Sequence, residues 1–396
     1  MKMAVVGGGP IGLEVAARAL RDDWDVQVFE RGVPGDNVAQ WGHVRFFSPW
    51  RLNRSPWGAA MLREAGVDDP DADAFPTGRE YLETYLRPLA GLGQLRDRIH
   101  TGVAVHGIAR RDALKGDLIA DPARDDGPFL LRVVEDGAES YREADVVVDA
   151  SGVFGQPRSL GPGGLEAIGE SAASARIQRK IPDVFGVDHE RYAGRRVLVV
   201  GAGHSAATTL KLLEELAATE PATQIAWVFR QPADAEPFAR FEDDPLPERD
   251  ALSAFANRAA TGRVAGITPV GGAWIHSVLP TEDGALEVTL EKEDGRQRFV
   301  VDEIVSNVGY RPNLELAREL QVHLCYASEG IMNLAAALLG EAGGDCLQQE
   351  SKGLDTLLNP EPSFFVAGSK SYGRNSSFLL RVGFEQIETI FDHLAD

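Results

Sequence analysis

The sequence has 396 residues, which is enough for two or three domains with sizeable hydrophobic cores. Its hydrophobic content of 44% and charged content of 25% are ordinary for a soluble globular enzyme. The 60 acidic residues outnumber the 40 basic ones, and the resulting net charge of -20 disfavours binding to a nucleic-acid backbone or an acidic membrane surface.

The two cysteines, Cys325 and Cys346, form neither a C-x-x-C nor a C-x-x-x-x-C pair. This spacing argues against the usual redox-active disulfide and against a zinc site built on thiolates, so we expect two reduced thiols and no metal. No apolar run is long enough to cross a bilayer, and no signal peptide precedes the first predicted strand. We therefore expect a cytoplasmic protein.

The chain opens on a short apolar strand that leads into a glycine-rich turn. A G-x-G-x-x-G pattern follows, with its glycines at Gly7, Gly9 and Gly12. The first glycine permits a tight turn, the second lets a pyrophosphate approach the bare backbone, and the third allows close packing of helix on strand. The spacing predicts a helix over residues 13–20, whose N-terminal amides and dipole would face the phosphates.

A second apolar strand, predicted at residues 26–29, ends in Glu30. A carboxylate about 20 residues beyond the third glycine can accept hydrogen bonds from an adenosine ribose. The strand, turn, helix, strand and acidic residue together predict a dinucleotide-binding domain.

Residues 40–57 form an aromatic segment that contains half of the six tryptophans of the chain. Because its apolar residues follow neither a period of 2 nor one of 3.6, we expect an irregular segment that forms a wall of a cofactor and substrate pocket. Trp41 and Arg45 are candidate cofactor contacts, and His43 is a candidate catalytic residue. The alternative is an aromatic core under a loop.

The next part of the chain alternates between helix and strand patterns. Residues 81–92 have the apolar spacing of a helix, with Thr77 as a plausible N-cap. Residues 112–127 are rich in Asp, Ala and Gly and predict a surface excursion. Three runs are predicted strands: residues 99–108, 129–134 and 146–150.

The last of these strands leads into Asp149-Ala-Ser-Gly152, a run of small residues that a proline soon ends. Such a segment can pass the chain to another domain at low steric cost. We expect Gly152 to contact a cofactor.

A second strand, glycine turn and helix begins near residue 195. Gly201 and Gly203 occupy the first two motif positions, and Ala206 occupies the third, where a methyl group still permits close packing. Ser205 opens the predicted helix. A helix over residues 205–218 and a strand over 224–229 follow, and Arg230 comes after that strand. Two such units in one chain are a much stronger signal than either alone.

The two units differ at the end of their second strand. A carboxylate such as Glu30 suits a free ribose hydroxyl, whereas an arginine such as Arg230 can pair with a 2′-phosphate. The first unit therefore fits the adenosine of FAD and the second fits NADPH. The alternative for Arg230 is a solvated cation at the end of a strand.

The remaining segments predict a helix, a small meander, two further exits from strands and a terminal helix. Gly309 and Gly368 each follow a predicted strand and are candidate cofactor contacts. The cluster from Lys370 to Arg374 favours contact with an anion, with an exposed basic turn as the alternative. The predicted elements are a helix at residues 251–260, strands at 274–279, 285–291, 297–301 and 303–307, and a helix at 383–394.

The paired glycine motifs and the exits at residues 149–152 and 307–313 resemble those of flavoproteins with two dinucleotide-binding domains. Among these, the chain is most similar to flavin-containing monooxygenases and their N-hydroxylating relatives. The resemblance implies an α/β fold of two Rossmann-like domains, with the NADPH domain inserted into the FAD domain. The implied domains are residues 1–160 with 304–396 for FAD, and residues 161–303 for NADPH.

The resemblance also implies roles for single residues. The segment Leu52-Asn-Arg-Ser-Pro56 is similar to the family segment whose asparagine lies beside the flavin ring, which implies that Asn53 lies near the oxygen-reactive edge. The family pattern F-x-G-x-x-x-H before the second glycine motif is shortened here, between Phe185 and His189. Ser369 also stands where many relatives have an aspartate.

These features predict an FAD- and NADPH-dependent oxidoreductase, with a monooxygenase that oxygenates nitrogen or sulfur of a small molecule as the leading hypothesis. Its expected partners are a small-molecule substrate and oxygen, with a homodimer as a further expectation. One alternative is a flavin-dependent reductase or dehydrogenase with a different acceptor. Another is a redox sensor that binds flavin without catalysis. In each case the flavin would carry the redox chemistry.

Overall fold

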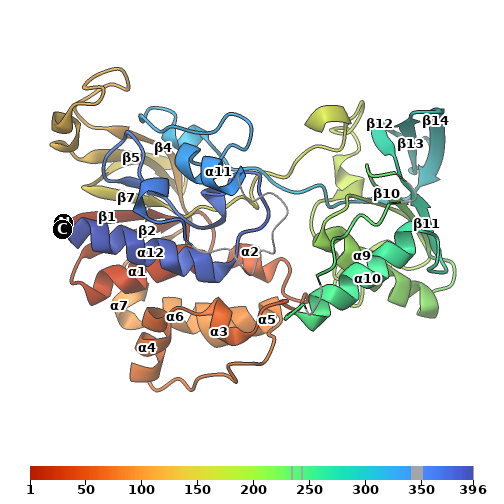
Figure 1. Ribbon diagram of the computed structural model, residues 1–396, viewed down its shortest axis with the longest axis horizontal. Coiled ribbons are helices and arrows are strands. Elements are labelled where there is room, and N and C mark those ends of the chain that lie inside the picture. The colour runs from red at the N-terminus through yellow and green to blue at the C-terminus, as the bar shows by residue number, and fades with distance from the viewer. Residues whose placement is uncertain (233–234, 242–243, 340–350, 396) are drawn as a thin grey trace. The chain divides into compact units, whose positions relative to one another are not determined.

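The computed structural model describes residues 1–232, 235–241, 244–339 and 351–395. Cys346 lies outside these ranges. The chain divides into two compact units (Figure 1), residues 1–156 with 310–396 and residues 157–309. Within the described ranges no helix is long and apolar enough to span a membrane.

The first unit is built on a parallel sheet of five strands in the order β16-β7-β1-β2-β3. Strands β1, β7 and β16 are apolar and almost completely buried, as expected when both faces of a parallel sheet are covered. The five strands are β1 (Lys2–Val6), β2 (Asp25–Glu30), β3 (Ile99–Thr101), β7 (Val146–Asp149) and β16 (Phe364–Val366).

Helices cover one face of this sheet, and a second sheet covers the other (Figure 1). Met3 and Val5 of β1 pack in a core with α1 (Pro10–Arg21) and α12 (Leu380–Ala395). Ala4 and Val6, which point the opposite way, pack in a core with the antiparallel sheet. That sheet is made of β4 (Val103–Arg110), β5 (Phe129–Glu135) and β6 (Ala138–Ala144).

The predicted strand over residues 99–108 is two strands in two different sheets. Gly102 separates β3 from β4, and its φ of +71° is a left-handed conformation that favours glycine. The prediction joined the two strands across Gly102, because the residues on both sides of this glycine favour strand. Strand β6 was also missed, because most of its side chains are exposed and polar.

The predicted helix over residues 81–92 is three consecutive pieces with a π-helical turn in the middle. The predicted N-cap at Thr77 is confirmed: Thr77 Oγ1 accepts a hydrogen bond from the Glu80 amide at 3.1 Å, and the Glu80 carboxylate accepts one from the Thr77 amide at 2.7 Å. The Thr77 amide holds the pKa of Glu80 below its ordinary value. The pieces are α5 (Gly78–Tyr81), the π-helix Leu82–Leu86 and α6 (Arg87–Gly91), followed by α7 (Gly93–Arg96).

The aromatic segment contributes largely to the hydrophobic core. Trp50 and Trp57 are buried at 5% and 8% exposure, and Trp41 and Phe46 pack against the same core. The structure thus agrees with the alternative, an aromatic core, for the two buried tryptophans. The segment is also less irregular than expected, since it includes α3 (Trp50–Asn53) and the start of α4 (Pro56–Glu64), after α2 (Asp36–Ala39).

The second unit repeats the first design. Its parallel sheet has the order β11-β10-β9-β15-β8. The strands are β8 (Ile177–Gln178), β9 (Arg196–Val200), β10 (Gln224–Val228), β11 (Ile267–Val270) and β15 (Glu303–Ser306). The predicted domain boundary between residues 303 and 304 falls inside β15, which pairs with β9 along its length. The short β8 and β11 were not predicted.

Helices α9 (His204–Thr219) and α10 (Pro247–Ala260) contact each other in this unit, and α8 (His189–Tyr192) precedes β9. The predicted meander is confirmed as β12 (Ala273–Pro280), β13 (Leu286–Lys292) and β14 (Gly295–Val301), which pair in antiparallel register. Apolar residues of the meander pack on β9, β10 and β15. The remaining elements are α11 (Met332–Leu339) and 3-10 turns at Pro122–Asp125, Pro162–Gly164, Ser174–Arg176, Glu315–Ala317, Leu354–Thr356 and Gly368–Lys370.

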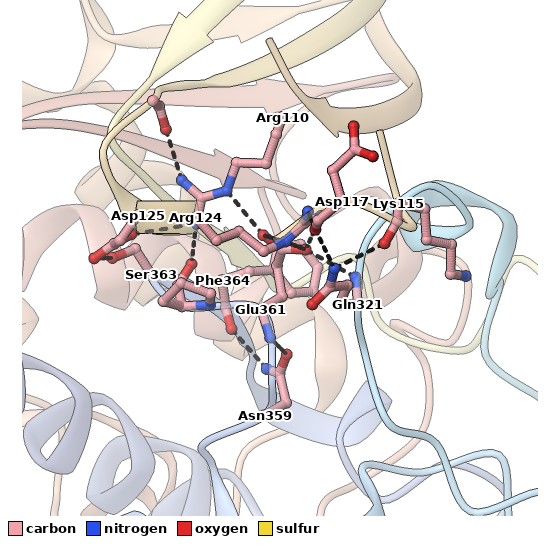
Figure 2. Close-up of polar contacts among 12 residues, drawn as sticks. Arg110, Lys115, Asp117, Arg124, Asp125, Gln321, Asn359, Glu361, Ser363 and Phe364 are labelled. Carbon is pink, nitrogen blue, oxygen red and sulfur yellow. Dashed lines mark hydrogen bonds and ion pairs between the residues drawn. The ribbon is translucent and has the colours of Figure 1, made fainter. Parts of the chain in front are cut away.

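A buried ionic network anchors the surface excursion of the first unit (Figure 2). The Glu361 carboxylate accepts hydrogen bonds at 2.8 Å from Arg110 Nε, from Arg124 Nη2 and from the Gln321 amide. All three charged side chains are at most 2% exposed. The Arg110 guanidinium also lies 3.8 Å from the centre of the Phe129 ring. The excursion is therefore fixed to β4 and to the segment before β16 by charges rather than by an apolar core.

Candidate functional site

The glycine turn after β1 lies where the strand order reverses. From β1 the chain passes to β2 and β3 on one side, whereas β7 and β16 lie on the other. Ligands of open α/β sheets bind at this point, beside the carboxyl ends of the strands. The second unit has the same arrangement, because β10 and β11 lie on one side of β9 and β15 on the other.

Gly7 and Gly12 are glycines because the backbone approaches them closely. Gly7 has a φ of +102°, and a Cβ there would lie 2.9 Å from the carbonyl oxygen of Ala150. A Cβ at Gly12 would lie only 1.9 Å from the carbonyl oxygen of Gly7. These two positions exclude larger residues whether or not a ligand is bound.

Gly9 differs from both, because the fold itself does not require it. Its φ of -79° suits any residue, and no atom lies within 4 Å of a Cβ built there. The open space adjoins the start of α1, a helix of 12 residues with no side-chain cap. Uncapped helix amides beside an open backbone suit a phosphate group. The turn therefore fits the pyrophosphate of a dinucleotide.

Glu30 is held at the edge of the same turn. Its carboxylate accepts hydrogen bonds from the amides of Gly8 at 2.6 Å and Gly32 at 2.8 Å. Each carboxylate oxygen keeps capacity for a further hydrogen bond, so the group can still accept from a ribose hydroxyl.

The loops that follow β7 and β16 lie next to each other, because the two strands pair in parallel. Gly152 and Gly368 have φ values of +68° and +73°, and a Cβ on Gly152 would lie 3.7 Å from the Ser369 hydroxyl. A Cβ on Gly368 would lie 3.0 Å from Ile11 at the start of α1. Both candidate glycines thus belong to the loops around the β1 turn. The third, Gly309, has a φ of +90° and belongs to the second unit, where its carbonyl accepts from the Arg158 amide at 3.0 Å.

Lys370 lies in a buried ion pair that the sequence reasoning missed. Its Nζ is 2.5 Å from Asp149 Oδ2 and 3.0 Å from the Ser151 hydroxyl. Asp149 Oδ1 accepts hydrogen bonds from the Ser151 amide and hydroxyl, at 3.1 and 2.6 Å. Lys370 is therefore not an exposed turn residue, and its ammonium group binds a carboxylate of the protein. The pair ties the β7 exit to the β16 exit.

Asn53 is buried, and its amide closes a local turn. Its Nδ2 donates to the carbonyls of Ser48 at 2.9 Å and Pro49 at 3.0 Å, and its Oδ1 accepts from the Ser48 hydroxyl at 2.8 Å. Tyr81 donates from its hydroxyl to the Asn53 carbonyl at 2.9 Å. The role of Asn53 beside a flavin ring stays a prediction, and these contacts already give its amide a structural role.

The other candidates of the aromatic segment lie at differing depths. Arg45 is exposed, and its guanidinium donates to the carbonyl of Phe75. Trp41 is half-buried, with its ring 5.1 Å from Phe46 between centroids. His43 is also half-buried. Contacts of these three residues with a cofactor or a substrate stay predictions.

The turn after β9 repeats the design of the first turn. Gly201 has a φ of +128°, and a Cβ there would lie 2.2 Å from the Asn307 carbonyl oxygen. Gly203 has no atom within 4 Å of a Cβ, and it precedes the uncapped helix α9 of 16 residues. Trp227 Nε1 donates a hydrogen bond to the Gly201 carbonyl at 2.8 Å and so holds the turn in place. The second turn also fits a pyrophosphate.

Ser205 and His204 are exposed in the first turn of α9. Desolvation of the imidazole by the surrounding protein and the nearby Arg249 guanidinium lower the pKa of His204. Arg230, two residues beyond β10, is exposed and lies with its guanidinium carbon 5.4 Å from the centre of the Trp274 ring.

A buried carboxyl group, Glu14, lies on α1 close to the first turn. It accepts hydrogen bonds from the hydroxyls of Ser55 and Tyr85, and the ion pairs found in the described ranges do not include it. Burial raises the pKa of Glu14, although the hydrogen bonds from Ser55 and Tyr85 oppose the shift. Burial and the nearby Glu14 charge raise the pKa of Tyr85 well above its ordinary value.

We expect the Glu14→Gln variant to gain stability relative to the wild type as the pH rises above the ordinary pKa of a glutamate carboxyl. A group with a raised folded-state pKa favours folding below its unfolded-state pKa, and this contribution is lost as the pH rises through the folded-state pKa. The gain should approach about 1.4 kcal/mol per unit of the pKa difference. Urea unfolding at several pH values measures it, with the exposed Glu64→Gln as control. A constant difference across the range would contradict this account.

No protein-family model matches the sequence, and no curated protein matches it. Solved structures do match. A bacillithiol disulfide reductase from Bacillus cereus is 16% identical and superposes with a TM-score of 0.70. The match covers 100% of this chain and 99% of the reductase. The T. acidophilum thioredoxin reductase is 14% identical, with a TM-score of 0.63, and the match covers 100% of this chain and 98% of the reductase. An ornithine N-hydroxylase from Kutzneria sp. 744 is 18% identical, with a TM-score of 0.63, and the match covers 100% of this chain and 99% of the hydroxylase.

The chain has two Rossmann-like α/β domains, each with a parallel sheet of five strands. These likenesses span nearly the full length of each protein, and they confirm the predicted fold class. At such low identity they show the fold alone. The predicted likeness to N-hydroxylating monooxygenases is supported in part, because disulfide and thioredoxin reductases share the fold equally well.

Proposed function

We propose that this protein is an FAD- and NADPH-dependent oxidoreductase, with FAD in the first unit and NADPH in the second. The observation that carries the proposal is the duplicated turn, in which the second glycine is open in both units although the fold does not require a glycine there. A side chain is tolerated by the protein at Gly9 and Gly203, so a ligand is the simplest reason for its absence.

In the first unit, the amides of α1 and the turn at Gly9 would hold the FAD pyrophosphate, and Glu30 would accept from the adenosine ribose. In the second unit, the turn at Gly203 and Ser205 would hold the NADPH pyrophosphate, with Arg230 at the 2′-phosphate. When bound, FAD would supply the redox chemistry of the reaction, with NADPH as the source of hydride. The protein positions both cofactors and shields them from water.

For the acceptor, we propose oxygenation of nitrogen or sulfur in a small molecule. An ornithine N-hydroxylase solved with reduced FAD, NADP+ and L-ornithine, and a cadaverine monooxygenase solved with FAD, share the fold. The chain has two cysteines, and their sequence spacing is not that of a redox-active pair. The cysteine spacing supports oxygenation over disulfide chemistry on the protein itself.

A second candidate is reduction of a small-molecule disulfide. Two bacillithiol disulfide reductases, from Bacillus cereus and Staphylococcus aureus, match with TM-scores of 0.70 and 0.66. Such a reductase would pass its electrons to the disulfide, and its NADPH oxidation would not be coupled to oxygen consumption.

Turnover assays with purified protein separate the two candidates. Oxygenation predicts NADPH oxidation with matched oxygen uptake that amines, thiols or thioethers stimulate, and a hydroxylated or oxidised product. Disulfide reduction predicts NADPH oxidation that persists without oxygen when a low-molecular-weight disulfide is supplied. Stoichiometric thiol formation under anaerobic conditions would overturn the monooxygenase proposal.

A further inference from the structure

We propose that Trp274 is a positioning residue for coenzyme selectivity: its ring holds the Arg230 guanidinium flat, so that its edge faces the 2′-phosphate of NADPH. The inference rests on the proposed function of the second unit and adds to it a residue outside the glycine turn and the β10 strand. Trp274 comes from the meander, at the start of β12.

The backbone on both sides of Arg230 is fixed to the start of β12. The Phe229 carbonyl accepts a hydrogen bond from the Ala273 amide at 3.3 Å, and the Gln231 carbonyl accepts one from the Gly272 amide at 2.6 Å. Gly272 has a φ of +66°, which makes the sharp corner between β11 and β12. These contacts bring Arg230 and Trp274 together by backbone pairing, before any contact between their side chains.

Trp274 is not required by the core of the meander. Its neighbours Ala273 and Ile275 are each 1% exposed, whereas Trp274 is 37% exposed, because successive side chains of a strand point to opposite faces. The large ring thus lies on the surface, where the Arg230 guanidinium carbon is 5.4 Å from its centre. A guanidinium stacked on an indole keeps its N–H edge free for a planar or tetrahedral anion.

The surroundings leave that edge available. Among the described residues, none of the ion pairs includes Arg230, in a protein with a net charge of -20. Glu291, which pairs across the strands with Trp274, lies 3.3 Å from His276 Nδ1 and is thereby held by another partner. Next to Arg230, the Gln231 side-chain oxygen is buried and makes no hydrogen bond in the described part of the chain. A phosphate-bearing ribose offers both an anion and hydroxyl donors to this corner.

The test measures binding of NADP+ and NAD+ to the flavin-loaded protein by titration calorimetry. We expect Trp274→Ala to weaken NADP+ binding about 3- to 10-fold, the usual worth of a cation–π contact, and to leave NAD+ binding within about twofold. The NADP+ affinity of Trp274→Phe should lie between that of the wild type and that of Trp274→Ala. Leu279→Ala, an exposed apolar residue of the same strand at 42% exposure, is the matched control and should change neither affinity.

A double variant separates positioning from simple stacking on the coenzyme. If Trp274 acts through Arg230, Arg230→Ala with Trp274→Ala should lose no more NADP+ affinity than Arg230→Ala alone. Equal loss of NADP+ and NAD+ affinity in Trp274→Ala, or additive losses in the double variant, would overturn the positioning role while leaving the proposed function intact. Wild-type protein that binds neither coenzyme would overturn the proposed function, and the selectivity role with it.

Discussion

Replacing Glu361 with alanine is expected to lower the free energy of unfolding by about 3–5 kcal/mol, the usual cost of removing one partner of a buried ionic network. The substitution would leave the guanidinium groups of Arg110 and Arg124 buried with no carboxylate between them. It would also leave the Gln321 amide without its acceptor. Figure 2 shows the Glu361 carboxylate between the side chains of Arg110 and Arg124, whose polar contacts it accepts. Chemical denaturation followed by circular dichroism measures the loss.

Two controls make this expectation specific. Glu139→Ala removes the carboxylate that pairs with Arg132 at 2.7 Å, but both side chains of that pair are largely exposed, so little change is expected. Glu361→Gln keeps the shape and the acceptor oxygen of the side chain and should lose less than Glu361→Ala, which provides a measurement if the alanine variant does not fold. Similar stability of the Glu361 and Glu139 alanine variants would contradict a structural role for the buried network.

Substituting valine for Gly9 is expected to abolish flavin retention while the protein stays folded. Because the turn is open at this position, the new side chain meets no protein atom within 4 Å of its Cβ and instead fills the space assigned to the pyrophosphate. Valine at Gly203 should have the complementary effect: normal flavin content and NADPH affinity lowered by at least about tenfold, roughly 1.4 kcal/mol. Flavin absorbance of the purified variants and NADPH titration measure the two losses.

Gly12→Val provides the contrast within the same motif. Its Cβ would lie 1.9 Å from the Gly7 carbonyl oxygen, so this variant should be destabilised even without cofactor. Thermal unfolding of the flavin-free proteins therefore separates Gly9, a ligand position, from Gly12, a packing position. Equal loss of flavin in the Gly9 and Gly203 variants would show that the division of cofactors between the two units is wrong.

Local patterns in the sequence were sufficient to predict the two glycine turns. Gly12 is set by the Gly7 carbonyl five residues earlier in the same strand-turn-helix unit, and a local contact of this kind leaves a fixed spacing in the sequence. The meander and the helix after each turn were predicted for the same reason, because each follows a short-range period of apolar residues.

Features that depend on distant partners could not be predicted in this way. Glu361 meets Arg110 across 251 residues, and Lys370 meets Asp149 across 221, so neither pair has a local signature. The buried Asp149 at the end of an apolar strand was the one available hint. The aromatic segment was predicted as a pocket wall because composition does not reveal which face of a tryptophan will be buried.

The proposed function is tested most directly by adding NADPH to the purified protein under anaerobic conditions while the flavin absorbance is recorded. We expect the protein to carry FAD in equimolar amount, NADPH to bleach its absorbance, and NADH to do so only at higher concentration. Failure to bind FAD after purification and reconstitution, or bound FAD that NADPH does not reduce, would contradict the assignment of the two turns.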